Sequence, residues 1–127
     1  MKLSPRKKLV KELDRVVSLY IRARDGECVV CGSTQRLTNG HLFSRNSHST
    51  RWDITDDGNC HCQCVSCNFS HEFCPYPFER WYQKKFGMKK YDDLYFRFHQ
   101  SVKFKDYQLQ EMIDEVNRKI KELQSNT

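Results

Sequence analysis

Apolar residues recur at helical spacing near both ends of the chain. The first such segment runs from about Pro5 to Arg24, because Ser4 and Pro5 are typical of a helix start and Asp25-Gly26 of its end. Its apolar positions are Leu9, Leu13, Val16, Val17 and Tyr20. The last segment runs from about Asp106 to Leu123, with apolar positions at Leu109, Met112, Ile113, Val116, Ile120 and Leu123. We expect this last helix to pack on its own domain or, alternatively, to form the seam of a dimer.

Two further helices and one short strand are predicted between these ends. A stripe of aromatic residues predicts a helix from Pro77 to Phe86, closed by Gly87, and another stripe predicts a helix over residues 91–98. Residues 41–58 are polar and irregular, whereas Asn59 to Cys64 reads as a short strand. One face of that strand would carry Asn59, His61 and Gln63, and the other Cys60 and Cys62.

Length and charge narrow the class of protein. A chain of 127 residues fits one domain, and no apolar run reaches the roughly 18 residues of a membrane span. The basic start lacks the apolar core of a signal peptide, so we expect a cytoplasmic protein. The formal charge of +6 is uneven, because residues 1–24 and 79–105 are basic while residues 25–78 are acidic. Two basic segments around an acidic centre favour a polyanionic partner such as nucleic acid, although each could also be a solvated helix face.

The seven cysteines predict a metal site. An odd number argues against a complete disulfide framework, and clustered thiols in a reducing compartment more often hold metal. Two Cys-x-x-Cys pairs, Cys28/Cys31 and Cys64/Cys67, supply the four ligands of a tetrahedral zinc site. Four thiolates leave no open coordination position, so this zinc would be structural and the chemistry must come from other residues.

A His and two Asn residues are interleaved with the cysteine pairs. His41, Asn59 and Asn68, in this order, resemble the motif of the HNH or ββα-metal nucleases. The resemblance is closest to the phage lambda NinG (Rap) recombination nucleases, and it covers roughly residues 25–95. The matching segments are Gly40-His41-Leu42-Phe43, Thr50-Arg51-Trp52-Asp53 and, most specifically, Asn59 to Asn68.

This resemblance implies a fold and a set of roles. In fold class, the chain would be α+β, with a ββα-metal finger over residues 25–98 that contains the zinc site. Outside the resemblance, the apolar and charged pattern adds a basic helix over residues 1–24 and an amphipathic helix over residues 99–127. His41 would be the general base, since a neutral imidazole accepts protons near pH 7. Asn59 would hold the His41 loop through hydrogen bonds, and Asn68 would be a ligand of a catalytic Mg²⁺ or Mn²⁺ ion.

The second ligand of this catalytic metal is not evident from the sequence. Many HNH sites place Asp directly before the catalytic His, but Gly40 occupies that position here. The alternatives are Asp53, His61, His71 and Glu72, of which we rank Asp53 and His61 first. His48 and His99 are not expected to be catalytic.

The resemblance favours a metal-dependent DNA endonuclease of phage or prophage origin. It also implies that the substrate is branched recombination DNA such as a Holliday junction. Because a junction has two-fold character, we expect a homodimer with the terminal helices as its interface. Residues expected to contact DNA are Arg6, Lys7, Lys8, Arg45, Arg51, Lys84 and Lys85, although Arg45 and Arg51 could instead form structural ion pairs. The alternatives are a non-catalytic zinc module that binds DNA and a RING-type interaction module, which would need a second zinc site.

Overall fold

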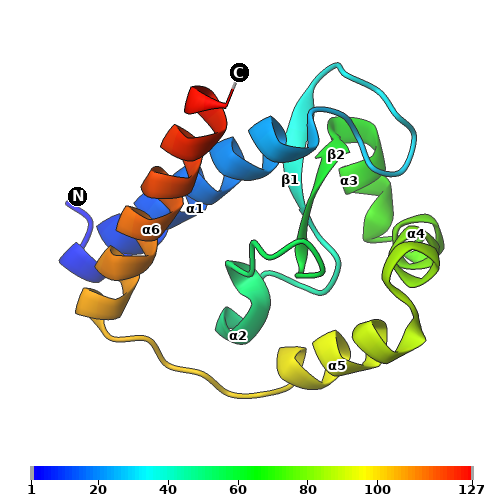
Figure 1. Cartoon of the computed structure of the whole chain (residues 1–127). Helices are drawn as coiled ribbons and strands as arrows, with labels where there is room; N and C mark the ends of the chain where they lie inside the picture. Colours follow the sequence, from blue (N-terminus) through cyan, green and yellow to red (C-terminus); the bar gives the residue numbers. More distant parts are fainter. Residues whose placement is uncertain (1, 127) are drawn as a thin grey trace.

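The computed structural model describes residues 2–126 (Figure 1). Within this range, helices surround a small two-stranded sheet. The elements are α1 (Pro5–Asp25), β1 (Leu37–His41), α2 (His48–Arg51), β2 (Cys60–Cys64), α3 (Val65–His71), α4 (Tyr76–Phe86), α5 (Met88–Phe98) and α6 (Asp106–Ser125). No helix in the described range is both long enough and apolar enough to cross a membrane.

The helices with apolar stripes lie where the sequence predicts them. The predicted N-terminal helix ends one residue later, at Asp25, and the predicted last helix continues to Ser125. Helix α5 begins at Met88 rather than near residue 91, because Gly87, with φ of +92°, ends α4 and allows the next helix to start at once. The pattern of apolar residues does not predict the short helix α2, which lies within the polar segment 41–58.

The sheet pairs β1 with β2 in antiparallel register, with Leu37 opposite Cys64 and His41 opposite Cys60. All five residues of β2 are buried, so both faces of this strand are covered. Cys60 and Cys62 pack in the cluster formed by α1 and α6, whereas the His61 ring contacts the aromatic side chains of α4. The predicted division into two faces is therefore confirmed for Cys60, His61 and Cys62, whereas Asn59 lies just before the strand.

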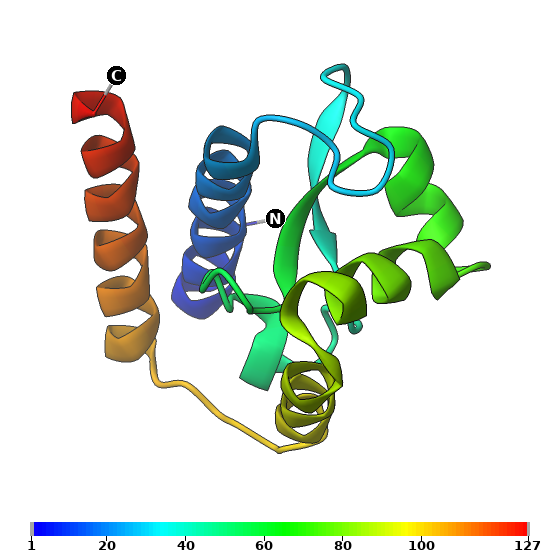
Figure 2. The ribbon, with the colours of Figure 1, turned by 45° about the vertical axis from the view of Figure 1, so that its right-hand side comes forward.

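Helices α1 and α6 lie side by side in both views of the molecule (Figures 1 and 2). Their N-terminal ends are joined by an ion pair between Arg6 Nη1 and Asp106 Oδ1, which are 3.0 Å apart. The apolar face of α6, with Leu109, Ile113 and Val116, is buried against α1. The last helix thus packs on its own domain, as expected, and a homodimer stays a prediction.

The C-terminal end of α1 is tied to the sheet by charged side chains. The backbone N–H of Cys62 donates to Asp25 Oδ2 at 2.8 Å, and Arg24 donates to the carbonyl oxygens of Ile54 and Cys60 at 2.9 and 3.1 Å. Arg24 and Asp25 also pair with each other, and both are largely buried. The chain then turns at Gly26, whose φ of +72° suits glycine, and enters the segment that carries the first two cysteines.

Candidate active site

The four cysteines of the two predicted pairs come together. The Sγ atoms of Cys28, Cys31, Cys64 and Cys67 all lie within 4.8 Å of one another. A tight turn brings the first pair together, because Gly32 N–H donates to the carbonyl oxygen of Cys28 at 2.8 Å and Gly32 has a φ of +80°. The second pair spans the junction of β2 and α3. Four thiols at this spacing could hold a zinc ion, which prefers tetrahedral thiolate ligands.

His41 ends strand β1, and its side chain is half-buried. Its Nε2 lies 3.0 Å from the carbonyl oxygen of Arg51, and a carbonyl only accepts, so Nε2 carries the proton. Nδ1 is therefore the basic nitrogen of the ring. Burial, which outweighs the hydrogen bond to Arg51, lowers the pKa of His41 to about 4. The imidazole is consequently neutral near pH 7, as a general base must be.

Asn59 is fully buried and holds the chain just after His41. Its Oδ1 accepts from the backbone N–H of Phe43 at 2.8 Å, and its Nδ2 donates to the carbonyl oxygen of Phe43 at 2.9 Å. In addition, the backbone N–H of Leu42 donates to the carbonyl oxygen of Asn59 at 2.9 Å. One side chain thus fixes the path of the backbone two residues after His41.

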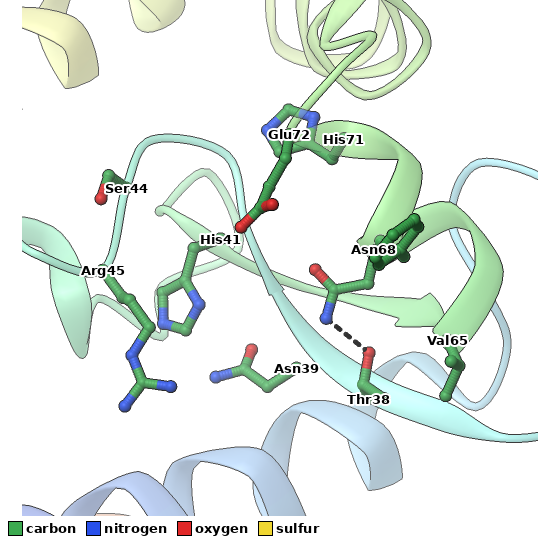
Figure 3. A pocket seen from close by; sticks show the side chains of 10 residues that line it. Thr38, Asn39, His41, Ser44, Arg45, Val65, Asn68, His71 and Glu72 are labelled. Carbon is green, nitrogen blue, oxygen red and sulfur yellow. Dashed lines mark hydrogen bonds between the residues drawn. The ribbon is translucent and has the colours of Figure 1, made fainter.

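The orientation of the Asn68 amide is set by its neighbours. Thr38 Oγ1 donates its proton to the carbonyl oxygen of Gln63 at 2.8 Å, so this hydroxyl can only accept from Asn68. Asn68 Nδ2 donates to Thr38 Oγ1 at 3.0 Å, which leaves Asn68 Oδ1 on the other side, toward the open space beside His41 (Figure 3). Thr38 is not predictable from the sequence, because a lone threonine in a strand gives no signal.

His41 and Asn68 line the same cavity, which has a volume of about 700 Å³. His71, Glu72 and Arg45 also line it, and the Glu72 carboxylate extends into the space above His41 (Figure 3). His71 Nε2 donates to the carbonyl oxygen of Leu42 at 2.9 Å, while its Nδ1 is buried without a hydrogen-bond partner. The cavity therefore combines a basic nitrogen, an amide oxygen, a carboxylate and a guanidinium.

Asp53 and His61 do not line this cavity, so our ranking of them as ligands of a catalytic metal is not supported. Asp53 Oδ2 lies 2.9 Å from Arg97 Nη2, and Asp53 Oδ1 accepts from the hydroxyl of Thr55. His61 is 1% exposed, lies among the aromatic rings of α4 and donates from Nε2 to the carbonyl oxygen of Gly58 at 2.7 Å. Both side chains are engaged in holding the fold.

The basic residues expected to contact DNA are dispersed. Arg45 lines the cavity and is more than half exposed, although it reaches Asp14 at 3.2 Å. Arg51 is largely buried and makes two hydrogen bonds to the same Asp14 carboxylate, at 3.1 and 2.6 Å. Its role is therefore the structural ion pair. The remaining ones lie outside the cavity, with Arg6, Lys7 and Lys8 in the first turn of α1 and Lys84 and Lys85 in the last turn of α4.

Gly40 lies in β1, where a side chain has no room. A Cβ atom at this position would lie 2.2 Å from Gln63 Oε1 and 2.8 Å from Gln63 Cγ. Gln63 is itself buried on β2. This contact gives a physical reason for glycine at the position where many HNH sites have Asp.

The sequence was compared with known protein families. The model of the NinG family, described as bacteriophage lambda NinG protein, matches residues 1–126. The chain belongs to the NinG family. This places it in a phage setting that is consistent with a role in recombination. The NinG match extends over both terminal helices, beyond the residues 25–95 that carry the motif. No curated protein and no solved structure matches the chain.

Proposed function

We propose that this NinG-family protein is a metal-dependent DNA endonuclease of the HNH (ββα-metal) type. The observation that supports this most strongly is the cavity in which the basic Nδ1 of a neutral His41 and the free Oδ1 of Asn68 come together. The elements β1, β2 and α3 occur in the order expected for such a finger, with the short helix α2 between the two strands, His41 ending β1 and Asn68 in α3.

His41 acts as the general base in this proposal. Its Nε2 proton is held by the carbonyl oxygen of Arg51, so Nδ1 accepts the proton of the water that attacks the phosphorus. Asn59 is a positioning residue, because its two hydrogen bonds to Phe43 keep the His41 loop in place. Arg45, more than half exposed beside the cavity, can bind a phosphate oxygen of the substrate.

Asn68 and Glu72 would hold the catalytic metal, in place of the Asp53 and His61 ranked first above. An amide oxygen and a carboxylate form the oxygen-rich donor set that suits Mg²⁺ or Mn²⁺. When bound, the ion would stabilise charge on the phosphoryl and leaving oxygens. His71 would position the loop through its hydrogen bond to Leu42, which follows His41 directly.

The four-cysteine cluster would hold a structural zinc ion. Asn68 directly follows the zinc ligand Cys67, so the zinc site and the catalytic cavity share the start of α3. A zinc-stabilised module that binds DNA without cutting it is the second candidate, favoured by Gly40 at the position of the usual Asp. The close contact between Gly40 and Gln63 weakens that argument, since it explains the glycine by packing.

A cleavage assay with His41→Ala tests the proposal. The substrates are a four-way junction, single-stranded DNA and linear duplex, each with Mg²⁺ or with EDTA. We expect Mg²⁺-dependent cutting, fastest on branched DNA, and a loss of at least about 100-fold in His41→Ala, as is typical of general bases. Lys121→Ala is the control, because Lys121 is exposed near the end of α6 and lies outside the cavity. Tight binding without cutting under any metal would favour the non-catalytic module.

The proposal includes a homodimer on branched DNA, because a four-way junction has two-fold character. Sedimentation of the zinc-loaded protein with and without a junction measures this directly. A protein that stays monomeric on the junction would contradict the dimer without affecting the assignment of the catalytic residues.

A further inference from the structure

A second cavity adjoins the His41 cavity along the loop that follows β1. It has a volume of about 720 Å³, and its polar and basic lining includes Arg6, Asn46, Ser47, His48, His99 and Lys103. The loop residues Ser44 and Arg45 line the first cavity, and the next residue, Asn46, already lines the second. Because neighbouring Cα atoms are about 3.8 Å apart, the linings of the two cavities are one residue apart along this loop.

The charged side chains that line this second cavity are all basic. None of its lining residues is acidic. Its cationic or protonatable side chains come from three separate parts of the fold, namely Arg6 from α1, His48 from α2, and His99 and Lys103 from the segment between α5 and α6 (Figure 1). A cavity built in this way by distant segments attracts anions.

Several basic side chains of this cavity have hydrogen-bond donors that could bind such an anion. Arg6 pairs with Asp106 through Nη1 alone, so its Nε and Nη2 remain. Lys103 and His99 are exposed. Burial lowers the pKa of His48, and the guanidinium groups of Arg51 and Arg6 lower it further, while the Asp14 carboxylate opposes them.

We propose that the second cavity binds the phosphate backbone of a nucleic acid whose scissile phosphate lies at His41. This inference deepens the proposed function by naming the surface that holds the strand on one side of the cut. A duplex strand carries a phosphate about every 3.4 Å along the helix axis, so a strand leaving the first cavity presents its next phosphates to the second. His48, His99 and Lys103 thereby become binding residues, together with Arg6.

The salt dependence of DNA binding tests this cavity. The zinc-loaded chain with His41→Ala, which binds without cutting, is titrated with linear duplex DNA over a range of salt concentrations. Adding Lys103→Gln or Arg6→Gln should weaken binding several-fold at low salt. Each should also reduce the slope of log Kobs against log salt by about 0.9, which is the value for one phosphate contact.

Two control variants separate charge in the cavity from charge and structure elsewhere. Lys121→Gln removes the same charge from an exposed position near the end of α6 and should leave the slope unchanged. Asp106→Asn breaks the same ion pair as Arg6→Gln but keeps the cation, so it should bind DNA at least as tightly as the parent. If Arg6→Gln and Asp106→Asn weaken DNA binding equally, the effect comes from the lost ion pair. Arg6 would then have a structural role, and its assignment as a phosphate-binding residue would be overturned.

The outcome does not depend on cleavage. Reduced slopes in a protein that never cuts DNA would support the cavity and contradict the nuclease. Unchanged slopes for Lys103→Gln and Arg6→Gln in a protein that does cut would overturn the cavity alone. A response of the His48 and His99 imidazole NMR signals to inorganic phosphate but not to DNA would also overturn it, since the site would then serve a free anion.

Discussion

Two histidines of this chain, His41 and His61, have similar electrostatics and different surroundings. Burial lowers the pKa of each to about 4, and each donates from Nε2 to a backbone carbonyl oxygen. His61 is 1% exposed and borders a different cavity, beside Trp81, whereas the half-buried His41 lines the cavity that also holds Asn68 and Glu72. A neutral imidazole is therefore not sufficient for catalysis; exposure of the ring and the groups that share its cavity distinguish the proposed base from the core residue.

The pH dependence of cleavage follows from the pKa of His41. A base with a pKa of about 4 stays unprotonated as the pH falls from 8 to 6. We therefore expect kcat/KM at fixed Mg²⁺ to stay nearly constant over that range. An ordinary imidazole, with a pKa of about 6.5, would lose about three quarters of its unprotonated form by pH 6. A midpoint near pH 6.5 in the measured profile would contradict the burial argument for His41.

Replacing Asn59 should affect stability more than replacing Asn68. Asn59→Ala leaves the buried N–H and carbonyl of Phe43 without their side-chain partners and should lower the free energy of unfolding by about 3 kcal/mol. Asn68→Ala removes one hydrogen bond at a half-buried position and should cost about 1 kcal/mol. Urea denaturation of the two variants measures both values, and equal losses would contradict the separate roles.

At the scale of the elements, the long helices are predictable because each buries a stripe of apolar residues that recur at helical spacing. Strand β1 was not predictable from its pattern, because Thr38, Asn39 and Gly40 show no apolar alternation, and pairing with β2 holds the strand in place. The proposed ligands of the catalytic metal are only partly predictable for a related reason. Asp53 pairs with Arg97 from α5, and a pairing between residues so distant in sequence leaves no local signal.

Strand β1 gives a testable explanation of Gly40. Gly40→Ala would bring a Cβ against Gln63, which is buried and has little freedom to move, so we expect a loss of about 1–3 kcal/mol in the free energy of unfolding. Gln63→Ala removes the obstructing atoms. The double variant should therefore lose less than the sum of the two single variants, as a double-mutant cycle measures. Strict additivity would show that Gln63 does not determine the residue at position 40.

For the whole molecule, the four-cysteine cluster joins segments that are distant in sequence. Cys28 and Cys31 follow α1, while Cys64 and Cys67 lie at the junction of β2 and α3. A bound zinc ion would connect the end of the N-terminal helix to the sheet and to the helix that carries Asn68. The metal would thus contribute to folding and to the position of a catalytic ligand at once.

Loss of this zinc should therefore unfold the domain. Cys28→Ser removes one ligand and should lower the zinc content and the thermal midpoint together, by well over about 5 °C if several kcal/mol are lost. Cys74→Ser is the matched control, because Cys74 is exposed and lies outside the cluster. Zinc analysis combined with thermal unfolding checks both. A Cys28→Ser protein that keeps its stability would contradict the four-cysteine assignment.

The packing of α1 against α6 sets the order in which the chain can finish folding during synthesis. Helix α1 leaves the ribosome first, but Leu13 and Val16 belong to a cluster completed by Leu109 and Ile113 of α6. Contacts across so long a stretch of chain form late, since the intervening segment must be made and its ends brought together. A nascent chain that stops before Asp106 would expose part of an apolar helix face to chaperones and proteases, so this core closes only after α6 has been synthesised.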